Sequence, residues 1–212
     1  MKDVAKIPVP HHIAVFGETQ SGKTTLMNRF SQNFQDHAVL FIDLEDMNEI
    51  ECEERFDMDS DLEEMRKALK DRKMVRYVPD AWDKETRQKE VKTLAKKLIF
   101  EWNLPVYVVA DEIQEYGGSG SSPFDVFAVR GLKRGVHLIA ITQRPAKLSK
   151  TIATQTDTFV FFEVGEFERS YFQQYNLPFE PIIKNFKQVP GDYWFQIYVR
   201  NQGLGKPLKL SL

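Results

Sequence analysis

Eight consecutive residues near the amino terminus have the types and spacing of a phosphate-binding loop. Segment 17–24 reads GETQSGKT and matches G-x-x-x-x-G-K-[ST] at every fixed position, with an apolar strand expected before it and a helix after it. The glycines let the backbone wrap around phosphates, and loop N–H groups with the helix N-terminus supply positive potential. The segment predicts an ATP phosphate site formed by Gly17, Glu18, Thr19, Gln20, Ser21, Gly22, Lys23, Thr24 and Thr25.

Four side chains in this loop and in a second segment have the chemistry of ATP hydrolysis. Lys23 is expected to reach the β- and γ-phosphates, and the Thr24 hydroxyl to ligate Mg²⁺. The second segment, VYVVADE at 106–112, is an apolar strand that delivers two acids to the edge of a sheet where ligands bind. Asp111 is expected to hold Mg²⁺ through water, and Glu112 to polarise the attacking water as general base.

A third segment, VHLIAITQ at 136–143, carries a polar amide at the end of another apolar strand. Gln143 can both donate and accept hydrogen bonds, which suits a sensor of the γ-phosphate and the attacking water. Taken alone, the residue could equally be a strand-end amide in the turn before Pro145. Its combination with the other two segments favours the sensor.

The elements that must position these residues follow from the hydrophobic pattern. Strand-length apolar runs alternate with helical periodicity, which is typical of α/β proteins. Strands are predicted at 13–16, 39–42, 74–78, 106–110, 136–142 and 158–164, and helices at 24–34, 81–102, 122–134 and 167–175. A capping box from Ser60 to Glu63 predicts one more helix. Residues 193–200 and 207–212 predict a C-terminal β-hairpin.

This order predicts an α/β fold, a P-loop NTPase three-layer sandwich with a mainly parallel central sheet and helices on both faces. Residues 1–212 are expected to form a single domain, with a core at about 12–165 and a C-terminal extension at about 166–212. No apolar run reaches the roughly 20 residues of a membrane span. With one cysteine and no signal-like N-terminus, we expect a cytoplasmic protein, in the host cell if it is viral, or one associated with the virion.

Charge is unevenly distributed along the chain. The net charge of −2 argues against a uniformly basic nucleic-acid binder. Twelve acidic residues lie between Asp43 and Glu64 with a single basic one, Arg55, whereas 66–76 is strongly basic. Solvated faces explain both stretches most simply.

The sequence resembles the HerA/FtsK superfamily. The resemblance rests on the phosphate-binding loop, the two acids after an apolar strand, and above all GVHLIAITQRP at 135–145, and it covers roughly 13–164. Members are ring-forming ATPases that pump double-stranded DNA. This chain has no room for the extra domains of HerA and FtsK proteins, so it is most similar to the genome-packaging ATPases of icosahedral double-stranded DNA viruses, including archaeal turreted viruses.

The resemblance implies partners and one further kind of catalytic residue. It implies sequence-independent binding of double-stranded DNA, self-association into a ring of five or six subunits, and contact with viral capsid or portal proteins. Basic candidates for DNA contact are 66–76, Lys147 and Lys150. An arginine reaching across a subunit boundary often completes such sites. Arg130 and Arg134 are favoured for that role over Arg144, which follows the sensor.

Three other functions are compatible with a phosphate-binding loop. A small nucleotide or nucleoside kinase fits the size, but its expected lid is arginine-rich, and GGSGSS at 117–122 has no arginine. A GTP-dependent switch lacks its N-K-x-D signature here. An ATPase that drives virion or protein extrusion is barely separated from packaging by sequence.

Overall fold

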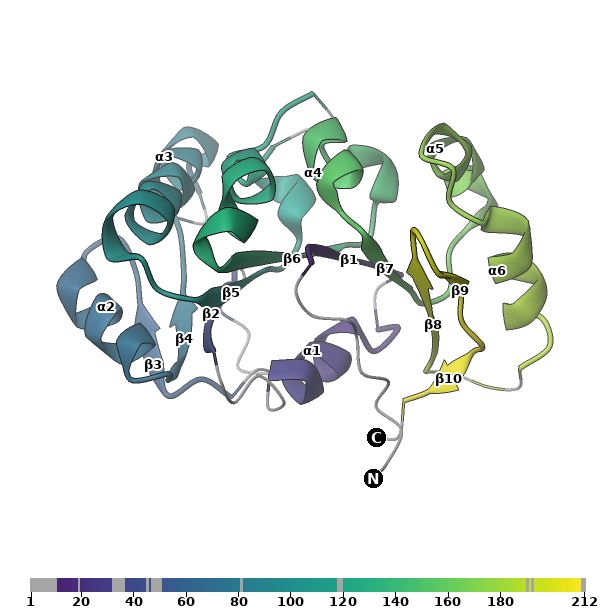
Figure 1. Ribbon diagram of the computed structural model, residues 1–212, viewed down its shortest axis with the longest axis horizontal. Coiled ribbons are helices and arrows are strands. Elements are labelled where there is room, and N and C mark those ends of the chain that lie inside the picture. The colour runs from purple at the N-terminus through teal and green to yellow at the C-terminus, as the bar shows by residue number, and fades with distance from the viewer. Residues whose placement is uncertain are drawn as a thin grey trace.

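The computed structural model describes residues 11–18, 20–31, 37–44, 46, 51–80, 82–117, 120–189, 191 and 193–210. A central sheet runs through the molecule, with strand order β10-β8-β7-β1-β6-β5-β2-β4-β3 and β9 paired with β8 (Figure 1). Its strands are β1 (Ile13–Phe16), β2 (Ala38–Ile42), β3 (Glu54–Phe56), β4 (Met74–Tyr77), β5 (Val106–Ala110), β6 (Val136–Thr142), β7 (Thr158–Phe161), β8 (Trp194–Val199), β9 (Gly203–Leu204) and β10 (Leu208–Lys209).

The sheet is parallel from β7 to β3 and antiparallel at its C-terminal side. β1 lies between β6 and β7, with Ile13 opposite Ile139 and Thr158. β8 pairs antiparallel with β7, and β9 and β10 both pair antiparallel with β8. The expected mainly parallel α/β sheet is therefore confirmed.

Helices cover the two faces of the sheet unequally (Figure 1). Helix α1 (Lys23–Ser31) packs on one face, and the opposite face carries the other helices. These are α2 (Leu62–Lys70), α3 (Lys84–Lys96), α4 (Lys150–Gln155), α5 (Arg169–Gln174) and α6 (Phe179–Phe186). A π-helical turn at Lys97–Trp102 continues α3, and another lies at Phe127–Gly131. Short 3₁₀ turns lie at Ile113–Glu115, Leu132–Arg134, Pro145–Lys147 and Glu166–Glu168.

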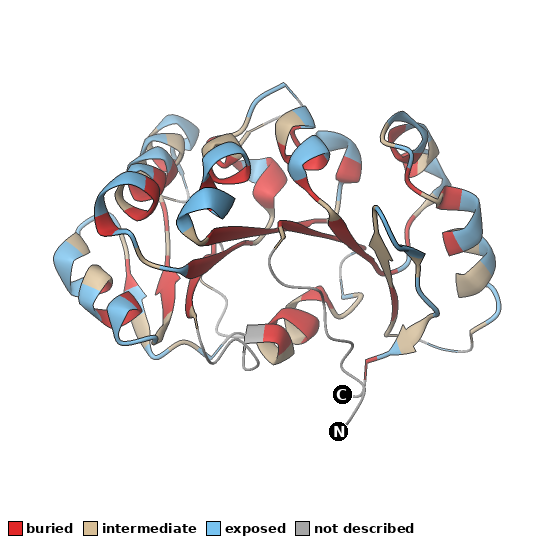
Figure 2. Cartoon of the chain, in the orientation of Figure 1, coloured by how far each residue is buried: buried red, intermediate tan, exposed pale blue. Residues whose placement is uncertain are grey.

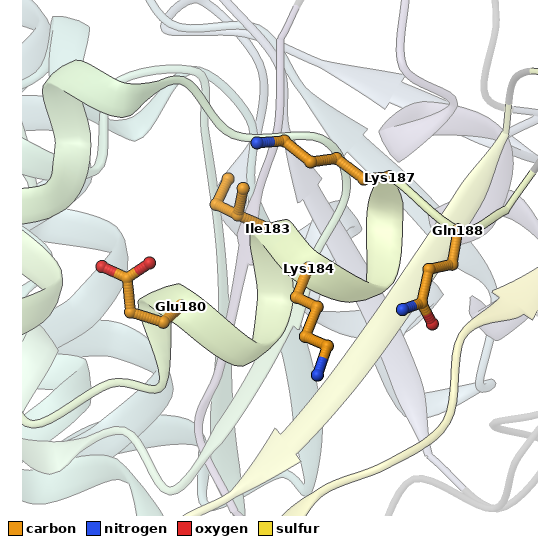
Figure 3. A pocket seen from close by; sticks show the side chains of 5 residues that line it. All are labelled: Glu180, Ile183, Lys184, Lys187 and Gln188. Carbon is orange, nitrogen blue, oxygen red and sulfur yellow. The ribbon is translucent and has the colours of Figure 1, made fainter.

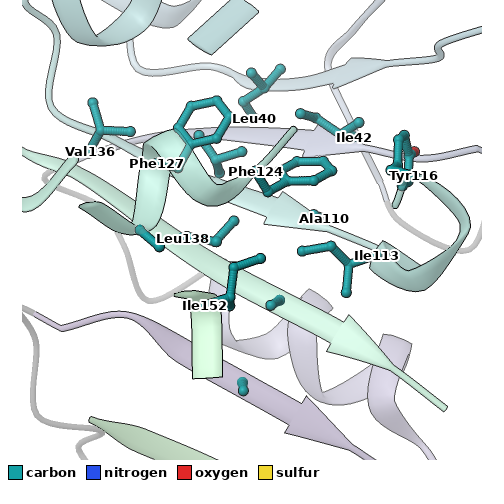
Figure 4. Close-up of a cluster of buried hydrophobic side chains, with 14 of the residues drawn as sticks. Leu40, Ile42, Ala110, Ile113, Tyr116, Phe124, Phe127, Val136, Leu138 and Ile152 are labelled. Atoms are coloured by element: carbon teal, nitrogen blue, oxygen red, sulfur yellow. The ribbon is translucent and has the colours of Figure 1, made fainter. Parts of the chain in front are cut away.

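Two apolar cores follow from the alternation of side chains along the strands. In β1, Ala14 and Phe16 belong to the larger core under the five helices, whereas Ile13 and Val15 face the core beneath α1. Because both faces of the central strands are covered, these strands are almost wholly apolar and appear as buried bands in Figure 2. Figure 4 shows part of the larger core, where Phe124 and Phe127 pack over β2, β5 and β6.

The predicted elements differ from the observed ones mainly at their ends. The strands predicted at 13–16, 106–110 and 136–142 have the observed bounds. The predicted capping box is wrong, because the Ser60 hydroxyl donates to Asp57 and Asp61 caps α2 by accepting from the Glu63 N–H. The helix predicted at 122–134 is present from Asp125 and runs through a π turn at Phe127–Gly131 and a 3₁₀ turn at Leu132–Arg134.

Three features were not predicted from the sequence. Strand β3 lies inside the acidic stretch, at the edge of the sheet, and α6 follows α5. The predicted C-terminal hairpin is present, and the pairing of β8 with β7, which the sequence did not indicate, makes it part of the central sheet. Across the described part of the chain, no helix combines the length and apolar character that a membrane crossing requires.

Candidate active site

The loop between β1 and α1 has the backbone of a tight phosphate-binding turn. Gly22 has a φ of +98°, a conformation that side chains strongly disfavour. A Cβ atom on Gly17 would lie 2.6 Å from the Cβ of Phe162, so only glycine fits there. Of the predicted nucleotide-binding residues, Thr19 lies outside the described residues. Ser21 has a buried hydroxyl with no hydrogen-bond partner among the described residues, as expected of a group that meets a ligand.

Residues near the C-terminus form a wall behind this loop. A Cβ atom on Gly22 would lie 3.1 Å from a methyl carbon of Leu210 and 3.2 Å from the ring of Tyr193. The aromatic ring of Phe162, which follows β7, is 3.4 Å from the same point. The loop is therefore supported by β1 and α1 and also by the strands that end the chain, a contact that local sequence could not reveal.

Lys23 begins α1 and turns its ammonium group back over the loop. Its Nζ donates a hydrogen bond to the carbonyl oxygen of Glu18 at 2.6 Å, and the residue is only 6% exposed. Burial lowers the pKa of Lys23, and the nearby Glu112 and Asp111 partly oppose this shift. The ammonium is therefore placed between the loop backbone and the two predicted acids.

Asp111 and Glu112 follow β5 at the carboxyl edge of the sheet. The Asp111 N–H donates to the Ile42 carbonyl at 3.2 Å, which continues the β2–β5 ladder by one residue. Burial, followed by the charges of Glu112 and Asp43, raises the pKa of Asp111 to about 6. Glu112 adopts the left-handed region, with φ 44° and ψ 45°, and its N–H donates to the Asp111 carboxylate at 2.9 Å.

The Glu112 carboxylate is held by two glutamine side chains. The Gln143 amide donates to Oε1, and the Gln114 amide donates to Oε2. Gln143 follows β6, which lies directly between β1 and β5 in the sheet. The structure thus brings the predicted sensor and the predicted general base into direct contact.

Gln114 was not identified by sequence reasoning. It lies two residues after Glu112 in a 3₁₀ turn and is 7% exposed, and its side-chain oxygen accepts a hydrogen bond from the Thr142 hydroxyl at 2.5 Å. A lone glutamine in a turn has no periodic pattern that marks it as buried. The one signal in the sequence was its D-E-x-Q spacing beside the two acids.

A buried ion pair lies beside Asp111. Asp43 follows β2, and its carboxylate is 3.8 Å from Nε of Arg76, which is on β4 and 4% exposed. Arg76 also contacts Asp46 at 3.4 Å. Arg76 was included among the basic candidates for DNA contact, and this burial corrects that inclusion. Lys73 in the same stretch pairs with Glu54.

The basic residues predicted around the site lie at two different edges of the sheet. Arg130 and Arg134 are exposed and precede β6, so they lie at the amino edge, opposite the phosphate-binding loop. Arg144 is exposed immediately after Gln143, on the same edge as the loop. Lys147 and Lys150 are also exposed and follow it in the chain. Within one subunit, Arg130 and Arg134 are therefore not brought to the candidate active site.

The residues present fit ATP with Mg²⁺. Asp43 follows β2, and Asp111 and Glu112 follow the adjacent strand β5. Burial, followed by the charges of Glu112 and Asp43, raises the pKa of Asp111, and a bound cation would oppose that shift. Thr24 and Asp111 could hold a divalent cation there, since hydroxyl and carboxylate oxygens are the ligands that Mg²⁺ prefers.

A separate open groove of about 300 Å³ lies along α6 (Figure 3). It is lined by Glu180, Ile183, Lys184, Lys187 and Gln188, and it includes none of the predicted site residues.

Comparison with solved structures identifies the architecture. The genome-packaging NTPase B204 from Sulfolobus turreted icosahedral virus 2, solved in complex with ATP-gammaS, matches 95% of this chain and 98% of its own, with a TM-score of 0.69 and 18% sequence identity. This chain has the fold of that packaging NTPase. The expected resemblance is thus confirmed at the level of the fold.

Two other ATPases share the fold over part of their lengths. The pCW3 conjugation coupling protein TcpA matches 94% of this chain and 59% of its own, with a TM-score of 0.58 and 16% identity. EccC from Thermomonospora curvata matches 91% of this chain and 36% of its own, with a TM-score of 0.51 and 16% identity. No protein-family model matches the sequence, and no curated protein does.

Proposed function

We propose that this protein is a Mg²⁺-dependent ATPase, a single domain over residues 1–212, that moves double-stranded DNA and packages a viral genome into a preformed capsid. The observation that carries the proposal is the convergence of Lys23, Asp111, Glu112 and Gln143 at one sheet edge, in contact or in electrostatic interaction with one another. The match to the packaging NTPase covers nearly all of both chains, whereas larger ATPases are matched over only part of their length. This difference supports packaging over the functions of the larger ATPases.

The side chains have separable roles in hydrolysis. When ATP binds, the Lys23 ammonium donates its hydrogen bonds to phosphate oxygens instead of to the Glu18 carbonyl, because the phosphate oxygens bear more negative charge. Glu112 accepts a proton from the attacking water, and Gln143 orients that water and contacts the γ-phosphate. Thr24 and Asp111 hold Mg²⁺, which neutralises phosphate charge when bound. Burial strengthens each of these electrostatic interactions.

The proposal requires a ring of subunits. Arg130 and Arg134 lie at the edge opposite the loop of their own subunit, so either could complete a phosphate site only in a neighbouring subunit. A ring also multiplies a small number of DNA contacts per subunit, which reconciles double-stranded DNA as a partner with a net charge of −2. The ring is expected to form on DNA or on a capsid or portal protein in the host cytoplasm.

DNA contact is proposed to be sequence-independent. The exposed Lys147 and Lys150 follow the sensor turn, so a phosphate contact there would lie close to the site of hydrolysis. The exposed basic residues of α2 are further candidates. Such contacts release counterions, so binding should weaken steeply as salt rises.

The deciding experiment measures ATP turnover at high protein concentration and low salt, with and without long duplex DNA. Stimulation by duplex DNA that disappears at high salt, and that does not depend on DNA sequence, is the expected result. Turnover without any response to DNA favours the extrusion alternative, for which the similarity to the type VII secretion ATPase EccC provides a structural precedent. Phosphate transfer to a nucleoside or nucleoside monophosphate would replace the proposal with the kinase alternative.

A further inference from the structure

The hydrogen bonds around Glu112 form a chain whose direction is fixed. The Arg144 backbone N–H, which can only donate, donates to the Thr142 hydroxyl oxygen at 2.9 Å. The Thr142 proton is therefore free to point to the side-chain oxygen of Gln114, which accepts it at 2.5 Å. With its oxygen engaged, Gln114 presents its NH₂ group to Oε2 of Glu112. No member of this chain can reverse without leaving a buried donor or acceptor unpaired.

The two glutamines that hold Glu112 differ in their surroundings. Gln114 is 7% exposed, and its anchor Thr142 is fully buried in the central strand β6. Gln143 is half-buried at the open end of the same strand, beside the phosphate-binding loop. Gln114 therefore belongs to the rigid part of the site, whereas Gln143 stands where an incoming phosphate can engage it.

The backbone of Glu112 explains why its side chain needs such support. Its φ of 44° lies in the left-handed region, which non-glycine residues disfavour. The following turn is closed by the Glu115 N–H, which donates to the Glu112 carbonyl at 2.8 Å. Residues held in such conformations persist where the surroundings fix them. Here Asp111 and Glu115 hold the Glu112 backbone, and Gln114 holds its side chain from the same turn.

We propose that Gln114 is a positioning residue that holds Glu112 through Oε2 throughout the ATPase cycle, while Gln143 releases Oε1 to the attacking water when it engages the γ-phosphate. This inference rests on the proposed ATPase function. Both carboxylate oxygens of Glu112 accept an amide donor, one from each glutamine. Binding of ATP frees one oxygen, and Gln114 keeps the other at a fixed position.

The test compares Gln114→Leu with the matched control Gln88→Ala. Gln88 also donates an amide hydrogen bond to this turn, to the Tyr116 carbonyl at 2.6 Å, but it does not contact Glu112. Since a 1 Å misplacement of a catalytic group can cost about 100-fold, kcat should fall by about 10- to 100-fold in Gln114→Leu. The KM, and the Kd for a fluorescent ATP analogue, should stay within about twofold of wild type, because Gln114 does not contact the phosphate-binding loop. Gln88→Ala should keep the wild-type kcat.

A second pair of variants keeps the inference testable if Gln114→Leu does not fold. Thr142→Ser retains the hydroxyl anchor and should keep most of the wild-type kcat, whereas Thr142→Val should lower kcat as Gln114→Leu does. In a Glu112→Gln background, Gln114→Leu should cause no further loss, because it acts through the carboxylate.

The outcomes separate this inference from the proposed function. A wild-type protein that binds ATP but never hydrolyses it overturns the proposed function and this inference together. Wild-type turnover with an unchanged kcat in Gln114→Leu overturns the inference alone. It is also overturned if Gln88→Ala loses as much activity, or if KM rises while kcat is preserved.

Discussion

Replacing Asp111 by asparagine should stabilise the nucleotide-free protein at neutral pH, although it should weaken Mg²⁺-dependent nucleotide binding. Burial and the charges of Glu112 and Asp43 raise the pKa of Asp111 from 3.8 to about 6. A carboxyl group whose pKa is higher in the folded state than in the unfolded state opposes folding when it ionises. The penalty is absent below pH 3.8, grows between pH 3.8 and 6, and is complete above pH 6.

One pKa unit corresponds to about 1.4 kcal/mol, so the full penalty at pH 7 is about 3 kcal/mol. Asparagine has nearly the same shape, and its side-chain oxygen can still accept from the Glu112 N–H. The variant should therefore unfold at higher urea concentration, and its Tm should rise by about 5–10 °C for a domain of this size. At pH 4 the wild-type carboxyl is protonated, so the stabilities of the two proteins should converge.

The assay is urea and thermal unfolding at pH 7 and pH 4, with a chelator to remove divalent cations. Asp59→Asn is the matched control, because Asp59 is exposed and should change stability little at either pH. A second measurement, Mg²⁺-dependent binding of a fluorescent ATP analogue, should show weaker binding by Asp111→Asn. The reasoning is refuted if Asp111→Asn is less stable than wild type at pH 7, or if the difference is the same at both pH values.

Three further predictions follow from the site and the core. Lys23→Ala should abolish ATP binding or turnover while the circular dichroism spectrum and Tm stay near those of wild type, and normal turnover would contradict the phosphate role. Glu112→Gln should still bind ATP but hydrolyse it about 10²- to 10⁴-fold more slowly, as single-turnover kinetics would show, and an unchanged rate would remove Glu112 as the base. Burial lowers the pKa of His12 to about 4, so protonation opposes folding as the pH falls from about 6.5 to 4. In urea unfolding, the free energy of unfolding of wild type minus that of His12→Asn should therefore fall by about 2 kcal/mol between pH 7 and pH 5. A difference that does not change with pH would refute this.

The parts of the fold that sequence predicted are those fixed by short-range patterns. The strands 13–16, 106–110 and 136–142 are buried on both faces, so their apolar runs gave their bounds directly. Lys23 and Glu112 follow two of these strands in the chain. Because the carboxyl ends of parallel strands share one edge of a sheet, the same pattern also predicted that both side chains lie at that edge.

The parts that sequence missed depend on contacts between distant segments. Pairing of β8 with β7 joins residues about 40 positions apart, and no local pattern reports it. The orientation of Gln114 toward Glu112 depends on Thr142, 28 residues away, whose hydroxyl donates to its side-chain oxygen. The Asp61 cap of α2 was missed because Ser60 and Asp61 are both favourable caps, and the bond from Ser60 to Asp57 decides between them.

The support of Gly22 by Tyr193 and Leu210 has a consequence for synthesis of the protein on the ribosome. The phosphate-binding loop emerges long before Tyr193 and Leu210, which form its rear wall. β1 also requires β6 and β7 as sheet neighbours, so most of its pairing comes from chain made more than 120 residues later. A nascent chain therefore completes its nucleotide site only after Leu210 has left the exit tunnel, and truncated translation products should lack the finished loop.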